Sequence, residues 1–290
     1  MGNEIIVHDE EGYEPSYLEE LQKDDFLALW KPVIDSGEYV YLQSDQKIHR
    51  RTCLTGELMH EAPLDRKWIY TNNPTNQHCA WYHSIALQVH HFIPSYCLNC
   101  WKVVVRPQSI VELFDLYDLQ LEMVKKEPDC YCKLGCEERE FVFGNYGGYF
   151  YNRSLEAGLD RRDQVRELAK DIITDPEENI YLKRYCSEFE LKYGPSAYYR
   201  QPPNTGHWER IIEEKCNMIP TYTVQPEDVR RRVKREWIKF AWDRGDKAVY
   251  TFTNDEPIVR PCVRYDRPPE DMGELIQNKI NKSSGKQDSQ

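Results

Sequence analysis

The sequence lacks any apolar run near the roughly 18 residues that a membrane-spanning helix needs, so we expect no membrane segment. Its first residues lack the basic stretch and the apolar stretch of a secretory signal. We therefore expect a cytoplasmic protein whose ten cysteines are reduced, since disulfides persist mainly in secreted chains.

Common catalytic signatures are also missing. The sequence has no Walker loop, no GxGxxG that opens a helix, no GxSxG and no HExxH. Its acidic residues are scattered, so no acid–base pair can be selected. These absences leave open whether the chain is an enzyme.

What is present is enough apolar sequence to build a core. The 290 residues are 40% hydrophobic and 12% aromatic, which excludes a wholly disordered chain. The formal net charge of -11 argues against general coating of nucleic acid, because phosphates would repel most of the surface. A local basic face remains compatible with that charge.

The middle of the chain predicts an α+β fold. Ser109 and Glu112 have the spacing of a capping box before a run of apolar residues at helical intervals. We expect strand 101–106, a helix from 110, a cysteine-rich loop 128–136, strand 140–143, a glycine turn at 145–148, strand 149–151, a helix after Ser154 and strand 180–182. This βαββαβ order predicts a ferredoxin-like sandwich, with two helices on one face of an antiparallel sheet.

The flanking regions predict an N-terminal helical segment and a C-terminal helix–strand extension. We expect helix 15–30, strand 39–42, an irregular stretch 43–80, an extended connection 194–226, helix 226–242 and strand 248–252. The predicted division is 1–95 for the N-terminal segment, 96–193 for the core, 194–266 for the linker with helix and strand, and 267–290 for a flexible tail.

The cysteines form the strongest local pattern. A CxxC at Cys97 and Cys100 is followed by Cys130, Cys132 and Cys136, and structural zinc takes four such ligands, usually as two pairs. In the expected topology, the residues before the first two strands and after the fourth lie at one end of the sheet. The sequence therefore predicts a structural zinc site made by Cys97, Cys100, Cys132 and Cys136, with Cys130, Cys186, His90 and His91 as possible further ligands. An iron–sulfur cluster, or thiols that are simply buried, are the alternatives.

The histidines upstream suggest a further alternative. His90-His91-Phe92-Ile93-Pro94 resembles the first strand of the HNH nucleases, in which a histidine pair lies beside a proline and a CxxC often follows. That family has a longer loop, an Asn and a helical His after the pair, whereas Ser95 follows at once here. The resemblance implies metal-dependent nucleic-acid cleavage as one alternative. His90 or His91 as a zinc ligand or a buried hydrogen-bonded residue is the other.

A basic helix stands out in this acidic chain. Candidate contacts for a protein or nucleic-acid partner are Arg230, Arg231, Arg232, Lys234, Arg235 and Lys239. Tyr149 and Tyr151 alternate along one strand, so they share a face on which bases could stack. We expect a zinc-stabilised binding or regulatory protein; a metal-dependent enzyme, and a viral or assembly component without catalysis, are the alternatives. The oligomeric state is open.

Overall fold

The computed structural model describes residues 26–37, 39–50, 67–72, 82–216 and 225–258. The chain divides into two units, Met1–Val249 and Tyr250–Gln290, and the second unit contains helix α12 (Tyr250–Thr253). The expected tail 267–290 and the first part of helix 15–30 lie outside the described residues. No helix within the described ranges has the length and apolar character needed to cross a membrane.

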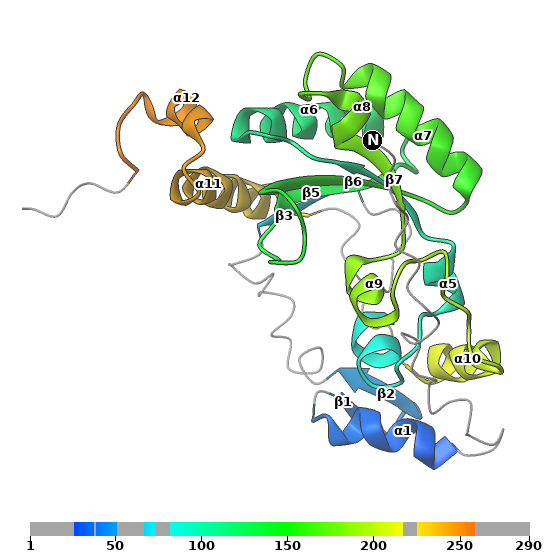
Figure 1. Ribbon diagram of the computed structural model, residues 1–290. Helices are drawn as coiled ribbons and strands as arrows, with labels where there is room; N and C mark the ends of the chain where they lie inside the picture. The colour runs from blue at the N-terminus through cyan, green and yellow to red at the C-terminus, as the bar shows by residue number, and fades with distance from the viewer. Residues whose placement is uncertain (1–25, 38, 51–66, 73–81, 217–224, 259–290) are drawn as a thin grey trace, which may run out of the picture. The chain divides into compact units, whose positions relative to one another are not determined.

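A five-stranded sheet organises the first unit (Figure 1). Its strands are β3 (Trp68–Asn72), β4 (Trp101–Val105), β5 (Tyr131–Cys136), β6 (Tyr146–Asn152) and β7 (Ile180–Arg184). They lie in the order β3-β5-β6-β4-β7, and every neighbouring pair is antiparallel. The fold is therefore α+β, as the sequence predicts.

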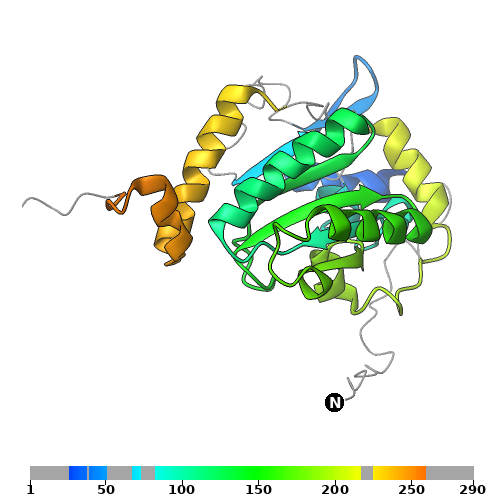
Figure 2. The ribbon, with the colours of Figure 1, turned by 90° about the horizontal axis from the view of Figure 1, so that it is seen from above.

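Two helices cover one face of this sheet (Figures 1 and 2). Helix α6 (Ile110–Lys126) begins where the Ser109 side chain accepts a hydrogen bond from the Glu112 backbone, and α7 (Leu155–Leu168) begins at Ser154 in the same way. Both predicted helix starts are confirmed. A short helix, α8 (Pro176–Asn179), leads from α7 into β7.

Side chains from alternate strand positions form the core under these helices. Val103, Phe150 and Leu134 are each almost fully buried in one cluster with apolar residues of α6. The same cluster includes Trp237 of helix α11 (Glu227–Asp243), whose indole Nε1 donates to the Lys67 carbonyl at 2.7 Å. The predicted helix 226–242 is thus confirmed, and the structure shows that it also packs in the main core, which the sequence did not predict.

The second strand of the core lies earlier in the chain than predicted. Residues 140–143 belong to the loop between β5 and β6, and the strand is Tyr131–Cys136, which the sequence indicated as a loop. The glycines of the predicted turn lie within β6. A Cβ on Gly148 would lie 2.4 Å from Leu116 Cδ2 and would force that buried side chain to shift, so the glycine allows close packing of α6 and does not form a turn.

A second buried cluster is built from the remaining elements. They are α1 (Phe26–Asp35), β1 (Tyr39–Leu42), β2 (Lys47–Arg50), the π-helix η3 (Tyr82–Leu87), α5 (Ser95–Leu98), α9 (Ser187–Tyr193) and α10 (Thr205–Lys215). Strand 39–42 is confirmed. Trp208 of α10 and Phe189 of α9 are among the largest side chains in this cluster.

Three flanking predictions are wrong in part. The stretch 43–80 contains strands β2 and β3, and the connection 194–226 contains helix α10. Residues 248–252 form helical turns, η4 (Lys247–Val249) followed by α12, in place of the predicted strand. A run as short as Ala-Val-Tyr-Thr-Phe does not show a hydrophobic periodicity that would distinguish a strand from a helix.

Candidate functional site

The basic residues of α11 fall into two groups because the turn of the helix places them on different sides. Arg230 is only 8% exposed, and its guanidinium donates to the carbonyls of Tyr70 at 3.3 Å and Thr71 at 3.2 Å. It lies on the same side as the buried Val233 and Trp237. Arg230, a candidate for partner contact, therefore helps to hold α11 against β3.

The opposite side of α11 carries a line of exposed cations. Arg231, Arg235 and Lys239 follow at intervals of four residues, which places them on one side of a helix. We call these three residues the basic stripe. Within the described part of the chain, no hydrogen bond or ion pair is found for their side chains, whereas the neighbouring Arg232 pairs with Asp228 at 3.2 Å.

Lys234 is partly exposed at the margin of this side. Its Nζ lies 4.2 Å from the centroid of the Tyr117 ring, a cation–π contact between α11 and α6. Lys234 therefore also contributes to packing.

The sheet face away from α6 and α7 carries aromatic and lysine side chains. Strand register places its members in facing rows: Lys183, Lys102, Tyr151 and Tyr131 in one, and Tyr181, Val104, Tyr149, Lys133 and Tyr70 in the next. We call this the aromatic–lysine face. Tyr149 and Tyr151 share it, as alternation along the strand requires.

The rings of this face contact one another and a lysine. Lys133 Nζ lies 4.9, 5.4 and 5.7 Å from the ring centroids of Trp68, Tyr70 and Tyr149. Tyr149 is only 6% exposed, and Tyr151 stacks on Tyr131 with centroids 4.2 Å apart. Of the two predicted stacking residues, Tyr151 is the one with partial exposure.

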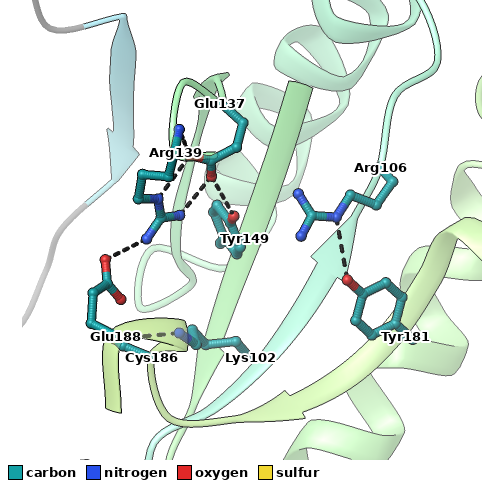
Figure 3. A network of polar contacts seen from close by, with 8 residues as sticks. All are labelled: Lys102, Arg106, Glu137, Arg139, Tyr149, Tyr181, Cys186 and Glu188. Carbon is teal, nitrogen blue, oxygen red and sulfur yellow. Dashed lines mark hydrogen bonds and ion pairs between the residues drawn. The ribbon is translucent and has the colours of Figure 1, made fainter. Parts of the chain in front are cut away.

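A polar network continues from this face (Figure 3). Arg106 Nε donates to the Tyr181 hydroxyl at 3.2 Å, and Lys102 Nζ donates to Cys186 Sγ at 3.4 Å. Burial, and then the charge of Lys102, lower the pKa of Lys183 to about 8. Lys183 is ion-paired with Glu190 of α9, and the buried Glu137 accepts a hydrogen bond from Tyr149, so acidic groups lie beside the cations of this face.

The predicted cysteine ligands do not all lie at one end of the sheet: Cys130 precedes β5 at the end where β4 begins, whereas Cys136 lies at the other end. Cys100 directly precedes β4 and its carbonyl accepts from the Tyr185 backbone at 2.9 Å, so Cys97, Cys100 and Cys186 belong to the end where β4 begins and β7 finishes. Cys136 pairs with Tyr146 at the opposite end of β5. The expectation that Cys130, Cys132 and Cys136 all precede the second strand is therefore wrong.

Cys132 is fully buried in the cluster under α6. The hydrogen bond between the two thiols lowers the pKa of Cys130, whereas that bond, and then burial, raise the pKa of Cys132. Among the residues that the structure describes, no group of three or more His, Cys, Asp or Glu side chains is placed to hold a metal ion. Zinc binding thus stays a prediction from the sequence.

The two histidines lie in different surroundings. His90 is fully buried, and burial, followed by the charge of His91, lowers the pKa of His90 to about 3. His91 has a left-handed backbone and contacts Lys192 Nζ through Nδ1 at 2.5 Å. His90 is therefore neutral in the fold over the ordinary pH range.

A shallow pocket of about 410 Å³ lies beside the CxxC turn. Ser95 Oγ donates to Glu209 at 2.8 Å, and the Arg153 guanidinium lies 3.6 Å from the centroid of the Tyr96 ring. Burial raises the pKa of Glu209. These contacts tie α10 to the turn before Cys97 and account for the polar lining.

Comparison with known proteins gives no relative from which a function could be transferred. No protein-family model matches the chain, and neither curated proteins nor solved structures give a match.

Sequence reasoning missed most of the aromatic–lysine face. Trp68, Tyr70, Tyr131 and Lys133 lie on β3 and β5, the two strands of the five-stranded sheet that were not predicted. The available signal was period-2 alternation: Tyr131 and Lys133 alternate with the buried Cys132 and Leu134. The core-facing positions of β5 are Cys132, Leu134 and Cys136, so cysteine takes two of the three positions in which an apolar strand pattern would be recognised.

Proposed function

We propose that this chain is a binding protein that holds the phosphate backbone of a nucleic acid on the basic stripe of α11. The observation that carries the proposal is the separation of the helix into a buried side, which uses Arg230, and an exposed side with Arg231, Arg235 and Lys239. Eight residues of α-helix extend about 12 Å, so the stripe offers a line of charge and not a single cation.

Such contacts position a nucleic acid without reading its sequence. Lysine and arginine on a helix surface reach phosphate oxygens, and that term dominates non-specific affinity. The net charge of -11 repels a polyanion elsewhere on the protein. Binding should therefore be confined to the stripe, weak at high salt and tolerant of sequence.

We further propose that β4, α6, β5, β6, α7 and β7 form a ferredoxin-like unit with β3 added at one edge. The strand order β5-β6-β4-β7 and the alternation of strands and helices support this topology. RNA-binding sandwiches of this kind stack bases on sheet aromatics. Here Tyr151 is the candidate for such stacking, and Tyr149 would first have to be uncovered.

The proposal is tested by fluorescence anisotropy with a labelled 20-nucleotide single strand and the matching duplex. Arg231→Glu with Arg235→Glu should weaken binding at least tenfold. The control, Lys126→Glu with Lys170→Glu, makes the same change in net charge at exposed residues of α6 and of the turn after α7, and should change the affinity less than twofold.

Two results would redirect the proposal. Equal loss in both double variants would show an effect of net charge alone. Tighter binding of an acidic peptide than of either nucleic acid would favour a protein partner.

The enzyme alternatives are tested on the same samples. An HNH-like nuclease would cleave the strand when a divalent metal is added, and an iron–sulfur protein would absorb visible light.

A further inference from the structure

The loop between β5 and β6, residues 137–145, projects two phenylalanines into solvent. Phe143 is 85% exposed and Phe141 is 46% exposed. We call residues 137–145 the Phe loop. Single exposed apolar residues are ordinary, but a phenylalanine exposed to this extent leaves a large apolar surface in water.

The base of the Phe loop is fixed by hydrogen bonds. The Glu137 backbone donates to the Asn145 carbonyl at 2.7 Å, and the Val142 backbone donates to the Arg139 carbonyl at 3.0 Å. These bonds close the loop and turn its tip. The phenylalanines are thus presented on an ordered support.

A partly buried ion pair stabilises the same base (Figure 3). The Glu137 side chain is 1% exposed and accepts from Arg139 Nε at 2.7 Å and Nη2 at 2.6 Å. Arg139 Nη1 also donates to Glu188 of α9 at 2.5 Å. Burial would raise the pKa of Glu137, but its bonds to Arg139 outweigh burial and hold the pKa below its usual value.

We propose that the Phe loop is a docking element for another protein, one that presents an apolar pocket with a basic rim. A rigid loop loses little conformational freedom on binding, which is what an aromatic anchor residue needs. The rim is specified by charge: Glu137 pairs with Arg139 and Glu138 pairs with Lys67, while Glu140, next to Phe141 in the sequence, is exposed and has no ion-pair partner among the described residues. This proposal does not depend on the basic stripe.

The charges also argue against other occupants. The unpaired charge of the exposed Glu140 repels an anionic lipid surface and a phosphate backbone. A second copy could offer the basic stripe as the complement of the loop. That contact would join different surfaces of two copies and form a ring or an open filament, and self-association is therefore one of the outcomes that the test separates.

The test uses the full chain with the photo-crosslinker p-benzoylphenylalanine in place of Phe143 or, as a control, of Leu155. Leu155 is 48% exposed at the start of α7. Irradiation in the cells that make the protein should give a discrete adduct only from position 143. The crosslinked protein is then identified by mass spectrometry, purified and titrated against the chain.

Phe143→Ser should weaken that purified complex at least tenfold, and Leu155→Ser should leave it within twofold. Both residues are exposed, so unchanged thermal unfolding serves as the check on folding. The proposal is overturned if position 143 gives no discrete adduct, or if Phe143→Ser leaves the affinity unchanged. It is also overturned if the variant instead abolishes self-association or binding to anionic vesicles.

Discussion

Single residues in this chain acquire their roles from helix phase and close packing. Arg230 and Arg231 are adjacent and chemically identical, yet one donates to two β3 carbonyls and the other faces water. The sequence predicted a basic helix but treated all six cations alike. Which arginine is buried depends on the position of the sheet, which no local pattern contains.

This difference predicts that substitutions of the two neighbouring arginines change the free energy of unfolding by different amounts. Arg230→Ala should lower the free energy of unfolding by about 2 kcal/mol, because hydrogen bonds to a charged donor are lost from buried carbonyls. Arg231→Ala should change it by less than about 0.5 kcal/mol, as expected of an exposed residue. Urea denaturation of both variants measures the difference, and equal effects would contradict the placement of Arg230.

Glycines give a second contrast at this scale. Gly148→Ala should destabilise the chain by about 1–3 kcal/mol, since the new Cβ lies 2.4 Å from Leu116 Cδ2 and overpacks the contact between β6 and α6. Gly206→Ala in α10 meets nothing within 4 Å and should be neutral or stabilising, because alanine favours a helix. Thermal unfolding of the pair tests this; a stable Gly148→Ala variant would refute the tight packing.

At the scale of elements, helices were predicted better than strands. Helices α6, α7 and α11 have caps or clear 3.6-residue periods, and these signals are local. Strand β5 contains cysteine, lysine and glycine, and it forms because β3 and β6 pair with it on both sides. The Phe-Val-Phe run has strong strand propensity but lies in the Phe loop, which shows that strand propensity depends on pairing partners.

The misplacement of β5 changes the zinc prediction. The structure keeps Cys97 and Cys100 at one end of the sheet and puts Cys136 at the other end of β5. If the chain binds zinc, Cys100→Ser should remove the metal and Cys136→Ser should retain it. Elemental analysis of protein purified without chelator measures this. Loss of zinc from the Cys136→Ser variant would contradict the arrangement, and a metal-free wild type would refute the prediction of zinc.

At the scale of the whole molecule, charge is distributed unevenly. An excess of acidic residues gives the net charge of -11, while one side of α11 carries three cations without a carboxylate partner among the described residues. Composition predicted the first property, and the run of basic residues indicated the second. Only the fold separates the cations that support the core from those that face solvent.

The most direct test of the central claim is the salt dependence of nucleic-acid binding. The logarithm of affinity falls with the logarithm of salt concentration by roughly 0.7–0.9 for each phosphate that a cation neutralises. Replacing Arg231, Arg235 and Lys239 with alanine should therefore reduce that slope by about 2–3 and weaken binding to all sequences alike. An unchanged slope in the triple variant would show that the basic stripe of α11 does not contact the phosphates.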